Sequence, residues 1–556
     1  MSISEELLKR EIITSAELGK AVDVHKSDGI RLEQALLKLG YVSERQLLEI
    51  TGEQLSLPVL DLTNIKIDED VLRLLPSRFV YRRRLVPLSR QNGNLQVATS
   101  DAYDLYTFDE IRLLTGLTVE PVLAPHDEID KVIKAHYGVG GDTVDEMVKT
   151  DEVNLVSSSG DETQDLLEMA QEASVIKLVN EIILEAINED ASDIHIEPYE
   201  HELSIRYRID GVLHEASVPP QIRRFQSAIT SRVKILADMN IAEKRLPQDG
   251  RIKFAVGTRQ VDVRVSVIPM LFGEGVVMRI LDKSSVLYTL EELGMSRETF
   301  DRFEEMIDRP HGIILVTGPT GSGKTTTLYS ALNAIVGPER KVLTVEDPVE
   351  YHLEGVNQIP VAHKIGMTFE RGLRSILRHD PDVIMIGEIR DLETARAATQ
   401  AALTGHLVLS TLHTNDAASA ATRLIDMGVE PYLVSSTVVG CMAQRLVRKI
   451  CSECREEFQP APEDLPPDFR ESTTTTLYHG VGCRNCRQTG YRGRSGLYEL
   501  LTTDEAVAEQ IMVRAPTTEI IRAGREGGLV LLREDGWLKV REGMTTPEEV
   551  VRCTAI

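Results

Sequence analysis

A glycine-rich segment with the spacing of a phosphate-binding loop lies at residues 318–325. Its eight residues are Gly318, Pro319, Thr320, Gly321, Ser322, Gly323, Lys324 and Thr325. In such a loop backbone N–H groups surround the phosphates, Lys324 reaches the β- and γ-oxygens, and the Thr325 hydroxyl can bind Mg²⁺. An apolar strand before the loop and a helix from Thr326 complete the expected context. The segment predicts a nucleoside triphosphate site with Mg²⁺; the alternative is an ordinary glycine-rich turn.

Carboxylates follow two other apolar segments, where they could serve hydrolysis of a bound nucleotide. Phosphoryl transfer needs a positioned water, a metal that neutralises charge, and a carboxylate that orients the water or holds the metal's waters. Glu388 follows residues 383–386 and is the Walker B candidate, and Glu346 and Glu350 follow residues 342–345. The alternative for Glu346 and Glu350 is an acid at a helix start, stabilised by the helix dipole.

Two histidines flank a third apolar segment, residues 407–411. His406 and His413 could sense the γ-phosphate or contact a neighbouring subunit. The alternative for each is a partly buried histidine whose hydrogen bonds are satisfied.

The elements that must position these residues alternate as strands and helices between about Glu291 and Cys441. The strands are continuously apolar, as in a parallel sheet covered on both faces. Because ligands bind at the carboxyl ends of the strands in an open α/β sheet, the polar residues after three strands should converge on the nucleotide. The expected fold class is α/β.

Four of the six cysteines form two Cys-x₂-Cys pairs, Cys451 with Cys454 and Cys483 with Cys486. Two such pairs separated by an insertion have the spacing of a tetrahedral zinc site, because each pair presents two thiolates to one ion. A site closed by four cysteines has no position for water, so its zinc would support folding. The alternatives are a redox pair, for which a thioredoxin-like context is missing, and cysteines with no common ligand.

Composition narrows the class of protein. The 556 residues suffice for about three or four domains. The formal charge of −25 argues against a surface that neutralises nucleic-acid backbones, so no nucleic-acid partner is expected. No apolar run reaches the roughly 20 residues that span a bilayer, and the N-terminus has no signal-peptide core. A cytoplasmic protein is expected, with any membrane contact made through partners.

The chain before the α/β region predicts two folded regions joined by a linker. Residues 1–140 begin with two similar helical units, each with a second helix that starts at an N-cap, Thr14 or Ser43. Short strands then indicate an α+β region, at residues 94–98 and 118–122. Residues 141–172 are rich in Asp, Glu, Ser and Thr, as is typical of a flexible linker; the alternative is an acidic loop packed on a domain.

A second α+β domain is expected over residues 173–287, with a helix followed by alternating strands. Its helix is expected at 174–186 and its strands at 193–197, 203–208 and 261–267. Residues 288–556 would hold the α/β domain, the zinc-binding insertion at 448–490 and C-terminal helices.

Four motifs in this order resemble the Walker A, Asp box, Walker B and His box of the type II/type IV secretion ATPases, most closely the general secretion pathway protein E branch. They are the phosphate loop, residues 344–350, residues 380–391 and residues 404–415. Similar segments at 191–198, 206–213 and 489–500 extend the resemblance over roughly residues 170–556. The resemblance implies a RecA-like ATPase domain behind a PAS-like α+β domain, with Lys324, Glu346, Glu388 and His413 in catalysis.

The same resemblance implies a homo-hexameric ring in which the second α+β domain covers a bound nucleotide. Arginines of that domain would stabilise charge on the transferred phosphoryl group. Arg206 and Arg208 are the first candidates, followed by Arg245 and Arg264. The alternative for each is a surface or strand-packing arginine.

The N-terminal region resembles a helical domain that in some family members binds cyclic di-GMP and in others docks on an inner-membrane platform protein. Members that bind the dinucleotide carry Arg-Leu-Gly at the start of each repeat. Here the second repeat reads Arg31-Leu-Glu33, and a carboxylate there would repel phosphate. Cyclic di-GMP is therefore not expected as a ligand.

The expected function is a hexameric ATPase that powers pseudopilus assembly and protein export in type II secretion. A type IV pilus assembly ATPase is the alternative. A nucleic-acid motor is a remote one, since the chain is acidic and has no basic stripe.

Overall fold

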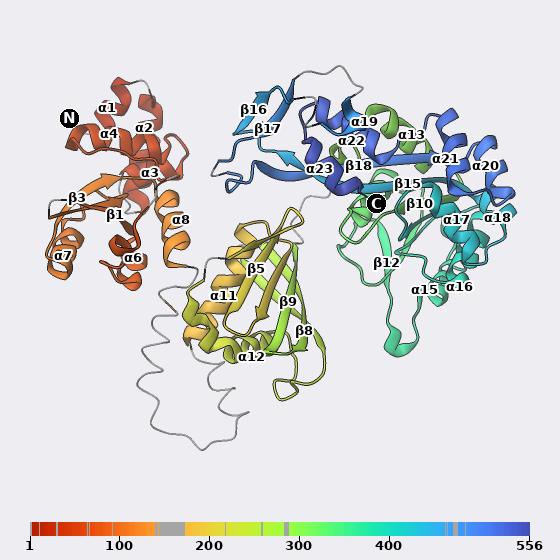
Figure 1. The fold of residues 1–556 in the computed structure, drawn as a ribbon, viewed down its shortest axis with the longest axis horizontal. Helices are drawn as coiled ribbons and strands as arrows, with labels where there is room; N and C mark the ends of the chain where they lie inside the picture. Colours follow the sequence, from red (N-terminus) through yellow and green to blue (C-terminus); the bar gives the residue numbers. More distant parts are fainter. Residues whose placement is uncertain are drawn as a thin grey trace. The chain divides into compact units, whose positions relative to one another are not determined.

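The computed structural model describes residues 3–138, 143 and 173–555 except for a few short gaps. The gaps are residues 11, 29–31, 64, 66, 92, 217, 257–258, 283–287, 462, 464, 471–475 and 484. The expected linker at 141–172 thus lies outside the described residues apart from Thr143, and Arg31 also lies outside them. The chain divides into two compact units, residues 1–282 and 283–556 (Figure 1).

The first unit begins with four short helices that confirm the predicted repeat. These are α1 (Ile3–Lys9), α2 (Ser15–Asp28), α3 (Leu32–Lys38) and α4 (Glu44–Leu55). Ser43 caps α4 through a capping box with Gln46, and Thr14 makes the equivalent exchange with Glu17 before α2. Apolar residues from both helical repeats form one buried cluster, so the two repeats fold as a single helical module.

A small α+β region follows, as the sequence predicts. Its sheet has the order β1-β2-β3, antiparallel between the first two strands and parallel between the last two. The strands are β1 (Leu85–Gln91), β2 (Asn94–Thr99) and β3 (Thr118–Leu123), and the helices are α5 (Glu69–Leu72), α6 (Ser77–Arg83), α7 (Leu105–Thr115) and α8 (His126–Tyr137).

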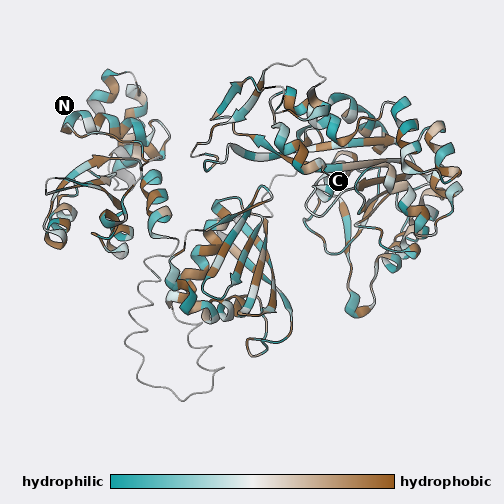
Figure 2. Cartoon of the chain, in the orientation of Figure 1, coloured by the Kyte–Doolittle hydropathy of each residue, from teal (hydrophilic) through white to brown (hydrophobic). Residues whose placement is uncertain are grey.

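The second α+β region of this unit contains a six-stranded antiparallel sheet in the order β6-β5-β4-β9-β8-β7. Alternate strand residues join residues of α11 and α12 in one buried apolar cluster, and Figure 2 shows both brown and teal along these strands. The elements are α11 (Ala173–Asn188), β4 (Asp193–Pro198), β5 (Leu203–Ile209), β6 (Val212–Glu215), a 3₁₀ turn (Pro220–Phe225), α12 (Gln226–Leu236), β7 (Gln248–Val256), β8 (Arg259–Met270) and β9 (Gly273–Asp282).

The second unit is built on a seven-stranded sheet in the order β12-β11-β13-β14-β10-β15-β18, parallel except for the last pair. The strands are β10 (Gly312–Thr317), β11 (Val342–Glu346), β12 (Val356–Pro360), β13 (Val383–Ile386), β14 (Leu407–Leu412), β15 (Val438–Ile450) and β18 (Tyr491–Thr502). Every residue of β10, β13 and β14 is buried, which confirms the predicted sheet covered on both faces.

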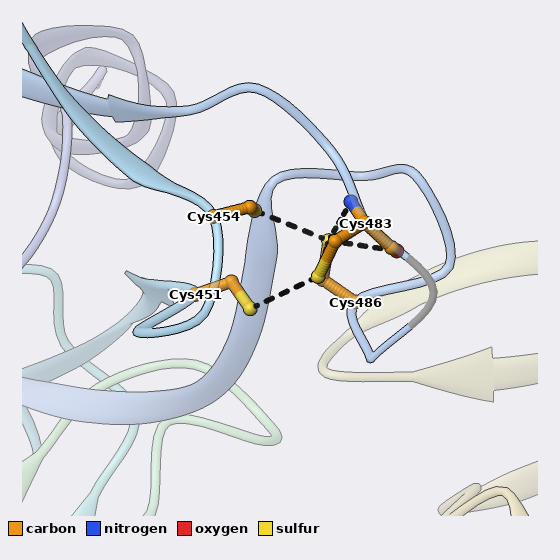
Figure 3. Close-up of side chains that lie close together, drawn as sticks. All are labelled: Cys451, Cys454, Cys483 and Cys486. Carbon is orange, nitrogen blue, oxygen red and sulfur yellow. Dashed lines mark hydrogen bonds between the residues drawn. The ribbon is translucent and has the colours of Figure 1, made fainter. Parts of the chain in front are cut away.

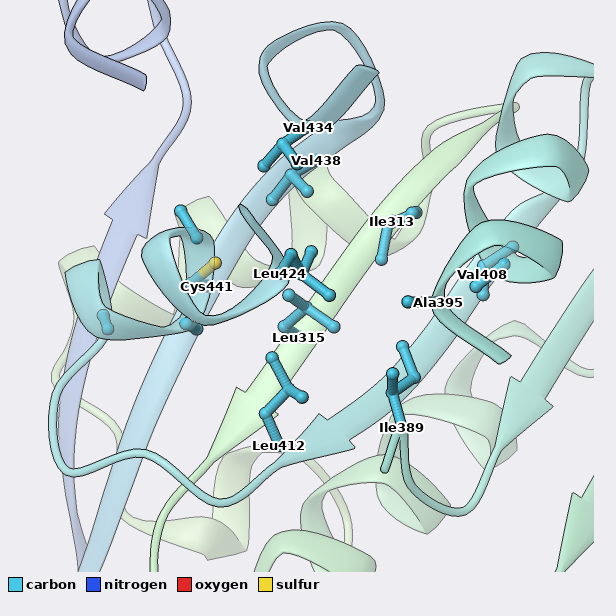
Figure 4. Close-up of a cluster of buried hydrophobic side chains, with 14 of the residues drawn as sticks. Ile313, Leu315, Ile389, Ala395, Val408, Leu412, Leu424, Val434, Val438 and Cys441 are labelled. Atoms are coloured by element: carbon cyan, nitrogen blue, oxygen red, sulfur yellow. The ribbon is translucent and has the colours of Figure 1, made fainter. Parts of the chain in front are cut away.

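Helices form two separate apolar clusters with this sheet. Leu315 and Leu412 lie in the cluster of Figure 4, with residues of the helices after β13 and β14. The helices of the α/β region are α13 (Arg297–Ile307), α14 (Lys324–Ile335), α15 (Phe369–Ile376), α16 (Leu392–Leu403), α17 (Ala418–Asp426) and α18 (Pro431–Thr437), with 3₁₀ turns at Glu291–Leu293 and His363–Ile365. Helix α14 begins at Lys324, two residues before the predicted start, because Gly323 is its N-cap.

The insertion that carries the two cysteine pairs lies between β15 and β18, and four helices follow β18. The insertion contains β16 (Arg455–Phe458), α19 (Pro467–Arg470) and β17 (Leu477–Gly480). The last helices are α20 (Glu505–Met512), α21 (Thr517–Glu526), α22 (Leu532–Arg541) and α23 (Pro547–Thr554). Across the described residues, none of the helices has both the length and the apolar character needed to cross a bilayer.

Candidate active site

The glycine-rich segment forms a loop between the buried strand β10 and helix α14. Gly318, Gly321 and Gly323 have φ values of +150°, +81° and +90°, which L side chains rarely adopt. A methyl group on Gly318 would lie 2.6 Å from both the Gln444 carbonyl oxygen and Ser322 Oγ. The loop therefore needs glycine at Gly318 for conformation and for space.

Lys324 is folded against this loop. Its Nζ donates to the carbonyl oxygens of Gly318 and Pro319 at 2.8 and 2.9 Å. Burial lowers the pKa of Lys324, the Glu388 carboxylate acts in the opposite direction, and the Arg445 guanidinium adds to the lowering. Thr325 is exposed on the first turn of α14, which leaves its hydroxyl accessible to a metal ion.

The parallel strands bring the predicted residues to one edge of the sheet. Thr317 at the end of β10 is opposite Leu412 at the end of β14, and Ile386 of β13 is opposite Ser410. The phosphate loop, Glu388 and His413 follow these three strands directly. Thr414 also donates its backbone N–H to Thr317 Oγ1 at 2.9 Å, which joins the two strand ends.

Glu388 interacts with two cationic or ionisable side chains. Its Oε1 accepts from Arg390 Nη2 at 2.5 Å, and its Oε2 lies 3.3 Å from His413 Nε2. The Glu388 side chain is 15% exposed, whereas those of Arg390 and His413 are 62% and 53% exposed. The Walker B candidate Glu388 thus lies at the edge of solvent. Its partners Arg390 and His413 are exposed, so water can replace either of them.

Glu346 is buried and bound by neutral donors. Thr344 Oγ1 and Gln358 Nε2 donate to its Oε1 at 2.5 and 3.2 Å, and the Tyr329 hydroxyl donates to its Oε2. Burial and the adjacent Glu346 carboxylate raise the pKa of Tyr329, so the phenol stays protonated as a donor. The alternative of a helix-start acid is wrong for Glu346 and Glu350, because β11 ends at Glu346 and no helix begins before β12.

The two histidines lie at opposite ends of β14. His413 follows the strand at the edge with the phosphate loop, whereas His406 precedes it at the other edge. His406 Nδ1 lies 2.9 Å from the Ala401 carbonyl oxygen and 3.1 Å from Thr404 Oγ1. The prediction that His406 senses phosphate is therefore wrong, and His406 is a partly buried histidine whose Nδ1 is hydrogen-bonded.

The arginines predicted to assist catalysis all lie in the first unit. Arg206 in β5 pairs with Glu197, and Arg208 Nε lies 3.6 Å from Asp193 Oδ2. Arg245 pairs with Glu243 at 3.0 Å, and Arg264 is in β8. Arg206 and Arg208 point to the same face of the sheet, opposite the buried Ile205 and Tyr207.

The four cysteines of the two pairs come together, and Figure 3 shows one pair from each side of the insertion. Their Sγ atoms all lie within 4.8 Å of one another, and three of the pairs are 3.7 Å apart. Sulfur atoms bound at 2.3 Å to a tetrahedral zinc would be about 3.8 Å apart. Cys483 and Gly490 also donate backbone N–H groups to Cys486 Sγ, as suits a thiolate ligand. The donor set fits zinc.

Sequence reasoning missed Gln444 and Arg445, which line the phosphate loop from β15. Thr327 donates to Gln444 Oε1 at 2.8 Å, and a methyl group on Gly318 would lie 3.1 Å from Arg445 Nη1. The sequence does not predict this contact, because β15 is far from the phosphate loop along the chain and its apolar pattern is interrupted by polar residues.

The largely parallel sheet with a phosphate loop after the interior strand β10 defines a RecA-like P-loop ATPase. The model of the type II/IV secretion system protein family matches residues 168–552, and the chain belongs to this family. A second model, of the MshEN domain, matches residues 55–143.

Relatives of similar length carry names from two kinds of machine. The type IV pilus assembly ATPase PilB of Myxococcus xanthus is 42% identical over 100% of this chain and 99% of its own. The type II secretion system protein E of Xanthomonas campestris is 44% identical over 99% and 98%. The type II secretion system ATPase E of Vibrio cholerae is 52% identical over 71% of this chain and 78% of its own.

The structure is also similar to solved ATPases. DotB of Yersinia pseudotuberculosis gives a TM-score of 0.51 at 21% identity, over 68% of this chain and 93% of its own. DotB of Legionella pneumophila gives 0.50 at 23%, over 67% and 93%. At this identity the likeness shows the fold, which is the predicted RecA-like one.

Replacing Lys324 with alanine should abolish ATP hydrolysis, lowering kcat/KM by roughly 100-fold or more, because the phosphates lose their principal cation. The fold should be intact, since the bonds of Lys324 within the described residues go to loop carbonyls. Steady-state phosphate release and circular dichroism check both parts. The matched control is Lys449→Ala, an exposed lysine outside the loop. Near-normal turnover in Lys324→Ala would refute the assignment.

Replacing Cys454 with serine should release one zinc ion per chain and lower the melting temperature by several degrees or more, because a structural zinc contributes folding energy. Metal analysis of the purified protein and thermal unfolding measure the two effects. Cys553→Ser is the control, since Cys553 lies outside the cluster. The zinc site would be contradicted if the wild-type protein contained no metal and Cys454→Ser had the melting temperature of the wild type.

Proposed function

We propose that this ATPase is a homo-hexamer that hydrolyses ATP to power pseudopilus assembly and protein export in type II secretion. The observation that carries the proposal is the convergence of Lys324, Glu388 and His413 at one sheet edge within a chain of this family. The relatives named type II secretion system protein E support the choice of machine. We also propose the domain division given by the sequence, with residues 173–287 as the nucleotide-covering domain.

The residues at the sheet edge take distinct roles in this proposal. Lys324 neutralises the β- and γ-phosphates, and Thr325 Oγ1 binds Mg²⁺, which supplies further neutralisation of charge. Glu388 holds waters of the metal, and His413 fixes the orientation of Glu388 through their 3.3 Å contact. Glu346 orients the attacking water from its buried position, because its carboxylate is already fixed by three donors.

We also propose that Arg206 and Arg208 stabilise charge on the transferred phosphoryl group, as the family resemblance implies. The sheet that carries them supports this role, because arginines occupy neighbouring positions across its polar face. Arg251 is opposite Arg264, Arg264 is opposite Arg279, and Asp193 lies between Arg279 and Arg208. Guanidinium groups gathered on one face of a sheet suit the binding of phosphate oxygens.

Extension of a type IV pilus is the second candidate, favoured by the full-length match to PilB. In both cases the chain would work in the cytoplasm and reach the inner membrane through a platform protein. A nucleic-acid motor remains a remote candidate, since a net charge of −25 does not favour phosphate backbones.

Turnover in the presence of possible partners tests these functions. We expect the cytoplasmic part of a type II secretion platform protein to raise ATP turnover several-fold, because the motor would work against that partner. The equivalent part of a pilus platform protein and duplex or single-stranded DNA should have no effect. The Lys324→Ala variant controls for contaminating ATPase. Stimulation by the pilus protein alone would favour pilus extension, and stimulation by DNA alone would contradict both secretion functions.

Cyclic di-GMP should not bind the N-terminal domain, because Glu33 replaces the glycine of the Arg-Leu-Gly order and adds a negative charge that would repel phosphate. Isothermal titration of the full chain with the dinucleotide measures this directly. Saturable binding at micromolar concentration would refute the prediction. In that case Glu33→Gly, which restores the Arg-Leu-Gly order, should tighten it.

A further inference from the structure

Arg445 lies against the phosphate loop from the strand next to it. Strand β15 pairs in parallel with β10, with Ala443 opposite Thr317, so Arg445 follows just beyond the end of β10. A methyl group on Gly318 would lie 3.1 Å from Arg445 Nη1. The guanidinium group therefore forms part of the wall of the loop, on the side where the loop begins.

Neutral oxygens are the hydrogen-bond acceptors of this guanidinium. Its Nη1 donates to the Gln444 carbonyl oxygen at 3.1 Å, and its Nη2 donates to the carbonyl oxygen and Oδ1 of Asn415 at 3.0 and 3.2 Å. Among the residues that the structure describes, no carboxylate lies within ion-pair distance of Arg445. Glu499 and Asp416 raise the pKa of Arg445 from farther away. These contacts use at most three of its five N–H groups.

Arg445 and Lys324 therefore place two positive charges beside the same loop. Burial lowers the pKa of Arg445, and Arg445 in turn contributes to the lowered pKa of Lys324. A half-buried cation bonded only to neutral groups is incompletely compensated, and a neighbouring cation adds repulsion. An anion at the loop would remove both costs, and a guanidinium group with free N–H groups matches phosphate geometry.

We propose that Arg445 is a second phosphate-binding cation of this ATPase, contacting the phosphates of a nucleoside di- or triphosphate at the Gly318 end of the loop. The two hydrogen bonds to Asn415 orient the guanidinium group beside the loop. The inference rests on the proposed role of the phosphate loop and adds a residue to it.

The alternative for Arg445 is a purely structural link between β15 and Asn415. The two roles predict opposite effects on the nucleotide-free protein. Removing a structural link lowers stability, whereas removing an uncompensated cation beside Lys324 leaves stability unchanged or raises it. Thermal unfolding without nucleotide therefore separates them.

The test compares Arg445→Gln, Arg445→Lys and Asn415→Ala in the full chain. ATP and ADP affinity is measured by titration with fluorescent analogues in Mg²⁺ buffer, together with the melting temperature in nucleotide-free buffer. We expect Arg445→Gln to weaken binding of both nucleotides by about tenfold or more, because a charge-assisted contact is lost. Its nucleotide-free melting temperature should not fall. Arg445→Lys should retain most of the wild-type affinity for both nucleotides. Asn415→Ala keeps the cation, so its nucleotide affinity should fall less than that of Arg445→Gln.

Arg396→Gln is the matched control, since it removes one exposed positive charge from helix α16 of the same unit. It should bind both nucleotides like the wild type. A lower melting temperature of Arg445→Gln with wild-type affinity would overturn this inference alone and establish the structural link. Failure of the wild type to bind either nucleotide would overturn the role of the phosphate loop and this inference with it.

Discussion

Strand β10 determines where the phosphate loop begins, and the rest of the site is arranged around it. The strand is completely buried and hydrogen-bonded on both sides, to β14 and to β15. The chain can leave the sheet only at Thr317, where Gly318 turns it against the backbone of β15. A strand free on one side could shift or fray, and the position of Lys324 would shift with it.

Side-chain contacts then fix the segment that carries His413 to this strand. Thr414 bonds to Thr317, Asn415 accepts from Arg445, and Ala417 donates its N–H to Glu499 at 2.8 Å. Burial raises the pKa of Glu499, although N–H groups of Ala417 and Leu532 oppose this. Because these partners lie on β10, β15 and β18, the segment is held by three strands, and His413 has a defined position despite its exposure.

The sequence predicts correctly those elements and motifs that continuous local patterns define. The apolar strands, the phosphate loop and the cysteine pairs lie within short stretches, and the parallel order of the strands places Glu388 and His413 at one edge. The position of His406 was also available from the sequence, because a residue that precedes a parallel strand lies at the opposite edge from one that follows it.

Contacts between distant segments could not be predicted in this way. Strands β15 and β18 are separated by the insertion with the two cysteine pairs and interrupted by polar residues and glycine, so neither shows a strand pattern that identifies its partner. Arg445 and Glu499 reach the site only because this antiparallel pair completes the sheet beside β10. In the same way, Tyr329 and Gln358 come from α14 and β12, and only the assembled fold brings them to Glu346.

The two acids of the site differ in how much freedom their surroundings leave them. A carboxylate offers about four lone-pair positions, and three donors occupy those of Glu346. The donors are neutral, and Thr344 and Tyr329 are fully buried, so these two lose hydrogen bonds that water does not replace if they leave the carboxylate. Glu388 is held instead by exposed Arg390 and His413, which water can replace. Under the proposed roles, Glu346 has one position left and can hold a single water in one orientation, whereas Glu388 has the freedom to adjust to waters that a bound Mg²⁺ would carry.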